Sequence, residues 1–504
     1  MKIFTNDDIR AIDRLTIERG TSSSELINRV AAGVTDEIIA RFPDSRPTAI
    51  FAGPGNNGAD ALAVAQRLAA QGFMPDVYLF NIGGDKLSAE CRTFRDNLKT
   101  QPGVRLVEVT GAFTLPDLDR SYLVIDGLFG SGLRDGLSGG FKSLVQYINE
   151  SGASVVSIDI PSGMFSDWNR GSINRNIIHA DLTITTQFPR LAFLMKENAE
   201  LVGEWKVIDI GLDSDAIRRT PANFQLVDAG GMKRLLKPRN PFCSKADFGH
   251  ALIAAGSYGM MGAAQFAALG ALRSGVGKVT VRSASWGYEV MQSAVPEAMF
   301  SSDPNDSIIT AIPSAHKFTS VAIGPGIGTA DATIMALETF LKSAVDPVVL
   351  DADALNCLAQ RRSMLDLIPD HSIITPHAGE FDRLFGKHSS DEERLIRAIK
   401  ASEDYNILIL LKGRYTALVR PDGKVYFNSS GTPALATAGS GDVLTGIIVS
   451  FLAQGYKPEV AALLGAFVHG VAGEIASESN GIYGTTAGDI AASTGKAIRR
   501  IMGE

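Results

Sequence analysis

The sequence predicts an α/β protein of two domains, the first built on a doubly wound parallel sheet. The chain has 504 residues, more than one ordinary domain holds. Short apolar runs rich in β-branched residues alternate with helical segments in both halves. Between the halves, residues 213–249 break this pattern with polar turns and Pro221, Pro238 and Pro241. We therefore expect one domain at residues 1–219 and another at residues 225–504.

The first domain opens with two expected helices. Thr5 begins the first, whose Ile9, Ile12 and Leu15 share one side, and Gly20 ends it. The second spans about residues 24–41. Buried parallel strands are then expected at residues 49–52, 76–80, 122–125, 155–158 and 182–185. Helical segments such as residues 59–71 and 139–151 separate them, as in a doubly wound sheet.

The second domain repeats this alternation. Strands are expected at residues 251–255, 278–282, 320–323, 347–350, 372–375, 407–411 and 416–420. Several end in glycine-rich turns or in acidic residues. Such turns allow the backbone to approach a phosphate closely. The sequence therefore predicts a second α/β domain with a ligand site at its strand ends.

Composition and charge exclude several classes of function. The net charge of −7 argues against an electrostatic surface for nucleic acid or membrane. The N-terminus lacks an apolar signal segment, and no run of 18 apolar residues occurs, so we expect a cytoplasmic protein. Cys91, Cys243 and Cys357 are dispersed, which suggests buried thiols in a reducing compartment and no metal site.

Residues 437–446, TAGSGDVLTG, form the most informative motif. The backbone N–H groups of Gly439, Ser440 and Gly441 would point at an anion from the start of an apolar helix. Asp442 beside this anion is the candidate base that takes a proton from a hydroxyl attacking a nucleoside phosphate. The alternative is that Asp442 only stabilises the helix start.

Three turns of the first domain carry polar residues at strand ends: GPGNNGAD at residues 53–60, DGLFGSGLRDG at residues 126–136, and SIDIPSG at residues 157–163. Together, Asn57, Asp126, Asp159 and Ser162 offer an all-oxygen cluster that suits a hard, weakly held cation. The alternative for Asp126 and Asp159 is loop capping through backbone N–H groups.

Four turns of the second domain carry similar signals. Residues 250–264 and 322–328 are rich in small residues, and LDADALN puts Asp351 and Asp353 at a strand end. TPHAGEF places His377 and Glu380 in a further turn. A single histidine is more often structural, but its place in this series of turns favours a functional His377.

The three N-terminal motifs resemble those of NAD(P)H-hydrate epimerases over about residues 1–215, with Ala59 where that family usually has glycine. The resemblance implies a Rossmann-like domain and a potassium ion held by Asn57, Asp126 and Ser162. Asp159 is our candidate acid/base, in an apolar setting that would raise its pKa. Asp126 is the alternative candidate for this role. Implied substrate contacts are Asn56, Asn57, Gly58, Ala59, Asp60, Gly130, Ser131, Gly132, Leu133, Arg134, Asp135, Gly136 and Asp159.

The C-terminal motifs resemble those of ribokinase-like NAD(P)H-hydrate dehydratases over about residues 225–504, with Ala378 in place of the commoner proline. Implied substrate contacts are Ala263, Gly326, His377 and Asp442. Implied nucleotide contacts, together with the anion-binding turn, are Lys412, Gly413, Arg414, Tyr415, Thr416, Gly439, Ser440 and Gly441.

In this order, the two domains resemble the fused bifunctional enzymes that repair nicotinamide nucleotides. The resemblance implies epimerisation of the R and S forms of NADH-hydrate and NADPH-hydrate, followed by dehydration of the S form. ADP or ATP would be consumed with Mg²⁺, giving AMP or ADP and phosphate. It also suggests a homotetramer.

One rival interpretation remains. The second half alone permits a ribokinase-like kinase for a vitamin precursor, and the first half would then be a non-catalytic binding module. Asn57, Asp126, Asp159 and Ser162 favour catalysis in the first half.

Overall fold

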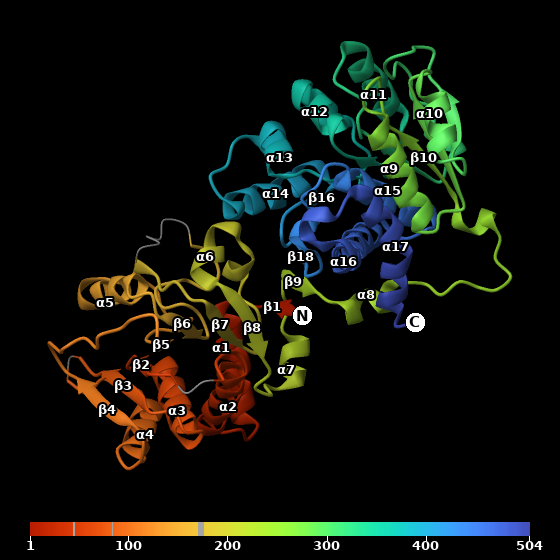
Figure 1. Cartoon of the computed structure of the whole chain (residues 1–504). Coiled ribbons are helices and arrows are strands. Elements are labelled where there is room, and N and C mark those ends of the chain that lie inside the picture. Colours follow the sequence, from red (N-terminus) through yellow and green to blue (C-terminus); the bar gives the residue numbers. More distant parts are fainter. Residues whose placement is uncertain (44–45, 83, 170–175) are drawn as a thin grey trace. The chain divides into compact units, whose positions relative to one another are not determined.

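The computed structural model describes residues 1–43, 46–82, 84–169 and 176–504. Contacts within the chain divide it into two compact units, Met1–Ala222 and Asn223–Glu504 (Figure 1). Each unit is a helix-covered sheet made largely of parallel strands, which confirms the expected α/β class.

The sheet of the first unit is parallel throughout, in the order β4-β3-β2-β5-β6-β7-β8. The chain enters at β2, moves outward to β4, and returns to the other side of β2 as β5. The sheet therefore has a switch point between β2 and β5, where ligands collect beyond the strand ends. Its strands are β2 (Thr48–Ala52), β3 (Pro75–Phe80), β4 (Arg105–Val109), β5 (Leu123–Gly127), β6 (Ser154–Ile158), β7 (Leu182–Thr186) and β8 (Glu204–Ile208); β1 (Lys2–Ile3) precedes them.

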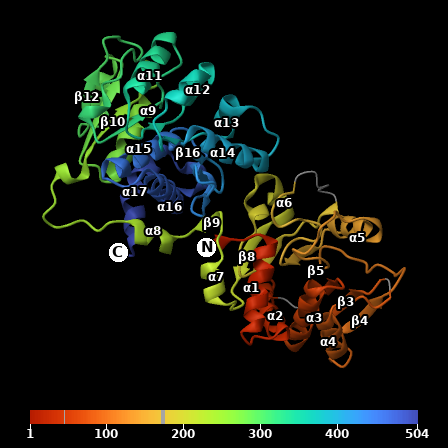
Figure 2. The same cartoon turned by 180° about the vertical axis from the view of Figure 1, so that it is seen from behind.

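Helices cover both faces of this sheet, with α3 and α5 on opposite sides (Figures 1 and 2). Ile50 packs in the core under α1 to α4, whereas its neighbour Phe51 packs in the core under α5. This alternation follows from the two-residue period of a strand buried on both faces. The helices are α1 (Asn6–Glu18), α2 (Ser23–Arg41), α3 (Asn56–Ala70), α4 (Ala89–Leu98), α5 (Gly139–Glu150), α6 (Ala199–Val202) and α7 (Ser214–Arg219).

The second unit holds a sheet in the order β9-β18-β17-β16-β15-β14-β13-β10-β11-β12. Its strands are parallel except that β17 runs antiparallel to β16 and β18. The strands are β9 (Phe224–Val227), β10 (His250–Ala254), β11 (Lys278–Ser283), β12 (Met299–Ser302), β13 (Ser320–Ile323), β14 (Val349–Leu350), β15 (Ile373–Ile374), β16 (Leu408–Leu411), β17 (Ala417–Val419) and β18 (Val425–Asn428).

Two glycines bring helices α9 and α15 into close contact. A methyl group at Gly446 would lie 2.0 Å from the carbonyl oxygen of Ala267, and one at Gly270 would lie 2.4 Å from that of Val443. This contact fixes the start of α15, which carries Asp442. The helices of the unit are α8 (Ala229–Leu235), α9 (Met261–Arg273), α10 (Gly287–Ala294), α11 (Asp331–Ser343), α12 (Asp353–Gln360), α13 (Ala378–Phe385), α14 (Asp391–Tyr405), α15 (Ser440–Ala453), α16 (Pro458–Gly484) and α17 (Ala487–Met502).

Among the helices that the structure describes, α16 is long and apolar enough to cross a membrane. However, 78% of its most apolar window is buried inside the protein. Burial of this kind is typical of a core helix in a large domain.

Some local expectations were wrong. Leu15 is 39% exposed, because α1 buries Ile9, Ile12 and Thr16 instead. Cys243 is exposed, whereas Cys91 and Cys357 are buried. Helix α3 begins at Asn56, earlier than expected, and β14 and β15 are only two residues long. The edge strands β4 and β12 were not expected, because their polar, partly exposed residues lack the apolar run of a buried strand.

Candidate active sites

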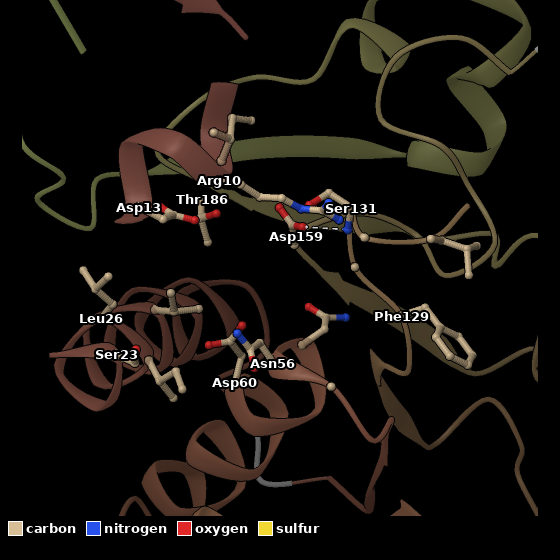
Figure 3. A pocket seen from close by; sticks show the side chains of 18 of the residues that line it. Arg10, Asp13, Ser23, Leu26, Asn56, Asp60, Phe129, Ser131, Asp159 and Thr186 are labelled. Atoms are coloured by element: carbon tan, nitrogen blue, oxygen red, sulfur yellow. Dashed lines mark hydrogen bonds between the residues drawn. The ribbon is translucent and has the colours of Figure 1, made fainter. Parts of the chain in front are cut away.

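A cavity of about 710 Å³ opens at the switch point of the first sheet (Figure 3). Its walls come from α1, α2, the start of α3, and the loops that follow β5, β6 and β7. The expected residues that line it are Asn56, Asn57, Asp60, Gly130, Ser131, Gly132, Leu133, Arg134, Asp135 and Asp159. Gly58, Ala59 and Gly136 lie outside its lining: Gly58 is packed against the Gly53 carbonyl, and Ala59 is in the core.

Asp159 follows β6 and has a positive φ of 67°, a conformation that non-glycine residues adopt mainly at constrained sites. Its carboxylate accepts hydrogen bonds from Arg190 at 2.5 Å and from the Ser131 N–H at 3.1 Å. Burial raises the pKa of Asp159, but Arg190 and Ser131 outweigh burial, and the net pKa lies below the ordinary value. The expectation of a raised pKa was therefore wrong.

Asp126 lies beneath the cavity, fully buried. Its two oxygens accept hydrogen bonds from Ser157 and Ser162 hydroxyls and from the N–H groups of Ser162 and Leu128. Burial raises its pKa, and these hydrogen bonds offset only part of the rise. This carboxylate holds loops together and does not line the cavity.

Asn57 carries a buried side-chain amide without a partner. Neither its oxygen nor its nitrogen finds a hydrogen bond among the described residues. Buried polar groups are rarely left this way, so an unpartnered amide facing a cavity indicates a bound group. The amide oxygen of Asn57 and the carboxyl oxygens of Asp126 are hard ligands of the kind that fits a potassium ion.

Two further carboxyl groups, Asp13 and Asp60, reach the cavity from α1 and α3. Burial raises the pKa of Asp60 well above its ordinary value, and Asp159 and Asp13 add to the rise. Burial also raises the pKa of Asp13 to about 6, against the opposing effect of Arg190. Both groups therefore hold a proton more tightly than an ordinary aspartate does.

The sequence motifs did not identify Arg190 or Asp13 as site residues. Arg190 is only 2% exposed, and its Nε and Nη1 atoms have no partner among the described residues. The available signal for it was a charged residue just after strand β7, in QFPRLAF. Asp13 gave no signal, because it resembles any polar residue on an amphipathic helix.

The second site lies at the start of α15. Gly439 precedes the helix with a φ of 87°. The Ser440 N–H, which was expected to face an anion, donates instead to the Thr437 carbonyl oxygen at 3.3 Å, so the N–H groups of Gly439 and Gly441 are the remaining candidate donors. Burial raises the pKa of Asp442 in the first turn of α15 to about 7; the Asp351 carboxylate adds to this rise and Lys412 opposes it. A carboxyl group with a pKa near 7 suits a general base.

Lys412 connects the charged groups around this site. Its Nζ lies 3.0 Å from Asp351 and 3.8 Å from Glu380. Asp351 also accepts a hydrogen bond of 2.6 Å from Thr445 on α15, and Gly441 lies beside the Lys412 Nζ. These residues come from the ends of β14 and β16 and from two helices, so the fold gathers them as the sequence predicted for strand-end residues.

His377 caps α13 and remains 54% exposed at its side chain. Its Nδ1 accepts hydrogen bonds from the N–H groups of Gly379 and Glu380, at 2.9 and 3.3 Å. The backbone of His377 forms an isolated parallel β-bridge with Lys412. Its ring is thus oriented by the backbone next to the charged cluster.

The remaining expected contacts fall into two groups. Ala263 and Gly326 are neighbours, since a methyl group at Gly326 would lie 3.1 Å from the Ala263 Cβ. Residues 413–416 form a turn after β16, in which Thr416 bonds to Gly413.

The sequence motifs did not identify His469 as a site residue either. It is buried, and its Nε2 lies 2.9 Å from the carbonyl oxygen of Ser440. Burial lowers the pKa of His469 to about 4, so its ring is neutral at pH 7, and in this form it positions Ser440.

Within the described residues, no group of three or more His, Cys, Asp or Glu side chains is arranged to hold a metal ion. Near Asp442, the carboxylates of Asp351 and Glu380 already interact with Lys412. Mg²⁺ fits this donor set only as an ion held largely by phosphate oxygens.

Comparison with known families matches both units. A family model described as YjeF-related protein N-terminus matches residues 23–192. A model described as NAD(P)H-hydrate dehydratase matches residues 251–495. Among solved structures, the ADP/ATP-dependent NAD(P)H-hydrate dehydratase of Bacillus subtilis, co-crystallised with ATP and Mg²⁺, is 27% identical, covers 55% of this chain and 99% of its own, and has a TM-score of 0.48.

Full-length relatives cover both units at once. A bifunctional NAD(P)H-hydrate repair enzyme of Moorella thermoacetica is 33% identical, across 97% of this chain and 95% of its own length. Another, from Thermofilum pendens, is 32% identical across 99% of this chain and 97% of its own. Because this identity extends through the cavity of the first unit and the Asp442 site of the second, the chain belongs to the family of bifunctional NAD(P)H-hydrate repair enzymes.

Proposed function

We propose that this chain repairs hydrated nicotinamide cofactors, with an epimerase at residues 1–219 and a nucleotide-dependent dehydratase at residues 225–504. The observation that carries the proposal is the pairing of two distinct acid/base sites in one chain. One is a cavity with several carboxyl groups, and the other is Asp442 at the head of an anion-binding helix. The substrates are NADH-hydrate and NADPH-hydrate.

Epimerisation takes place in the cavity of the first unit. The hydroxyl on C6 of the hydrated ring leaves as water, the ring nitrogen supplies electrons to C6, and water then adds to the other face. Asp159 is ionised beside Arg190, so it acts as the base that removes a proton from the entering water. The residues of these two turns that line the cavity bind the substrate: Asn56, Asn57, Asp60, Gly130, Ser131, Gly132, Leu133, Arg134 and Asp135.

Potassium is the proposed ion of this site, held by Asn57, Asp126 and Ser162. Support comes from the unpartnered oxygen of Asn57 and from the fully buried carboxyl group of Asp126. A bound cation would balance the charge of this carboxylate and hold the start of α3 against the β5 loop. Its contribution is thus positioning and electrostatic.

Dehydration takes place at the start of α15. Asp442 takes the proton of the C6 hydroxyl, whose oxygen attacks the terminal phosphoryl group of ADP or ATP. The bond from that phosphorus to the nucleotide breaks, and Gly439 and Gly441 donate N–H groups to the transferred phosphoryl. Phosphate then leaves C6, C5 loses a proton, and the dihydronicotinamide is restored. Lys412 and residues 413–416 bind the nucleotide, which brings Mg²⁺ with it.

Ala263, Gly326 and His377 complete the proposed hydrate site. Ala263 and Gly326 are small neighbours, and a flat ring would bind against their backbone. The oriented His377 ring offers a polar contact beside Asp442. From the resemblance, we also infer a homotetramer in the cytoplasm, which light scattering and cell fractionation would test.

The deciding experiment follows the absorbance of reduced nicotinamide in a mixture of NADPH-hydrate epimers, with Mg²⁺, potassium and either ADP or ATP. Full recovery by the unaltered chain supports both activities. Recovery that slows abruptly near the S fraction supports the dehydratase and removes the epimerase. No recovery with either nucleotide overturns the dehydratase and favours the vitamin-precursor kinase.

A further inference from the structure

The cavity of the first unit has carboxyl groups on two opposing walls. Asp159 lies on the wall formed by the strand-end loops, and Asp60 lies on the wall formed by α3 (Figure 3). Both side chains line this cavity, and the Asp159 carboxylate adds to the rise in the pKa of Asp60. A flat ring bound between these walls would present one face to each carboxyl group.

These two groups differ in their surroundings. Asp159 is bonded by Arg190 and by the Ser131 N–H. Asp60 makes no hydrogen bond or ion pair with the described residues, although it sits one turn into α3 at the cavity surface. Burial without a partner favours the neutral acid, in agreement with its raised pKa.

Epimerisation requires a proton at both faces of the ring. When the hydroxyl leaves one face, an acid on that face must supply a proton, so that it departs as water. When water adds to the other face, a base there must accept a proton. Asp159 alone cannot serve both faces, and its ionised state suits only the base.

We propose that Asp60 is the proton carrier on the wall opposite Asp159, and that these two carboxyl groups pass one proton across the bound ring. This assignment rests on the epimerase function proposed above. In one direction the C6–O bond breaks, Asp60 protonates the departing hydroxyl, and the ring nitrogen forms a double bond to C6. Water then adds from the other face, the nitrogen recovers its electron pair, and Asp159 takes the proton. In the reverse direction, Asp159 gives up the proton and Asp60 recovers one.

The other charged side chains lining the cavity are Arg10 and Asp13 on α1, Arg134 and Asp135 after β5, and Arg190 after β7. Arg190 is paired with Asp159. Asp13 also titrates near neutral pH, but it lies on the Asp159 side of the cavity (Figure 3). It therefore cannot protonate a hydroxyl that leaves toward α3.

The test compares Asp60→Asn with Asp60→Glu, Asp13→Asn and Asp36→Asn in the full chain. Asp36 is an exposed residue of α2 and serves as the matched control. Each variant receives one pure epimer of NADPH-hydrate in ¹⁸O-labelled water, and the initial rates of epimer formation and of ¹⁸O entry at C6 are measured from pH 5 to 9. Circular dichroism checks folding; because Asp60 has no partner, an amide there breaks no hydrogen bond.

We expect Asp60→Asn to lower kcat by about 100-fold or more with little change in KM, and to slow ¹⁸O entry equally. Asp60→Glu should retain much of the rate. The loss of activity at high pH, where the acid is deprotonated, should disappear in Asp60→Asn but persist in Asp36→Asn.

Three outcomes overturn this role. Asp60→Asn could raise KM alone, which would make Asp60 a binding residue. Asp13→Asn could abolish the high-pH limb while Asp60→Asn keeps it. The unaltered chain could fail to epimerise, which would remove the proposed epimerase together with this role, whereas the first two outcomes leave the epimerase in place.

Discussion

The guanidinium of Arg190 lies 2.5 Å from the carboxylate of Asp159, and both side chains are almost completely buried. Two nitrogens of Arg190 have no other partner among the described residues. The pair thus holds Asp159 in its charged form and leaves donors free at the cavity. It connects the ends of the neighbouring parallel strands β6 and β7.

Arg190→Gln should strongly destabilise the protein. Removing one partner leaves the buried Asp159 charge uncompensated, at a cost of about 3 kcal/mol or more. The pKa of Asp159 is lowered in the folded state, so the pair stabilises the fold above the ordinary carboxyl pKa and this contribution is lost as the pH falls through the folded pKa. Urea unfolding from pH 7 downward measures both effects.

Arg105→Gln is the control for this change, because Arg105 pairs with Asp76 at the same 2.5 Å but on the surface. Exposed pairs contribute little to stability. Equal losses of unfolding free energy in the two variants would contradict our account of the buried pair.

Potassium should be required for epimerisation and not for folding of the second unit. Replacing potassium with a large organic cation leaves Asp126 without a counter-charge and the Asn57 oxygen without a partner. We expect a large loss of epimerase rate and an unchanged dehydratase rate on the S form. Asn57→Leu should remove the potassium dependence along with most of the activity. A full epimerase rate in potassium-free buffer argues against this site.

A site whose residues adjoin one another in the chain can be predicted from the sequence. A contact between residues of two separate turns is harder to predict. Asp442 was found because Gly439, Ser440 and the apolar helix adjoin it in the chain. Its raised pKa comes from burial and from Asp351, which follows another strand, so the local motif did not reveal it. The link from Arg190 to Asp159 depends on the pairing of β6 with β7, which no local pattern specifies. For the same reason, the sequence placed Asp159 in an apolar setting and missed its counter-charge.

Amphipathic spacing was similarly incomplete. Leu15 fits the apolar side of α1 by its spacing, but the helix buries Thr16, whose hydroxyl bonds to the Ile12 carbonyl. A polar residue that satisfies its own hydrogen bond can replace an apolar one in the core. Which residues of a helix are buried therefore depends on the elements that pack against it.

Gly446→Ala should destabilise the second unit. Its methyl group would lie 2.0 Å from the Ala267 carbonyl oxygen, so α9 and α15 must separate, at a cost of about 2 kcal/mol. Because α15 carries Asp442, the dehydratase rate should fall as well. Gly262→Ala in α9, where nothing lies within 4 Å, is the matched control. Thermal unfolding measures the difference, and equal midpoints would refute the close contact of these helices.

Asp442→Asn should abolish dehydration, by about 100-fold or more, while epimerisation continues. In the unaltered chain, kcat/KM for dehydration should decline as the pH falls below about 7, because the base becomes protonated. The raised pKa has the opposite consequence for stability. A carboxyl group that binds its proton more tightly when folded makes the fold less stable as the pH rises from its ordinary pKa toward 7.

The same substitution should therefore raise the unfolding midpoint at pH 8, where a buried charge is replaced by a neutral amide, and have little effect at pH 4. Asp489→Asn provides the comparison, since Asp489 occupies the first turn of α17 and caps that helix through Thr486. It should lower the midpoint and leave dehydration intact. If Asp442→Asn behaves like Asp489→Asn, Asp442 serves only as a helix-start residue. Opposite shifts of stability in the two variants, with dehydration lost in one alone, identify Asp442 as the base.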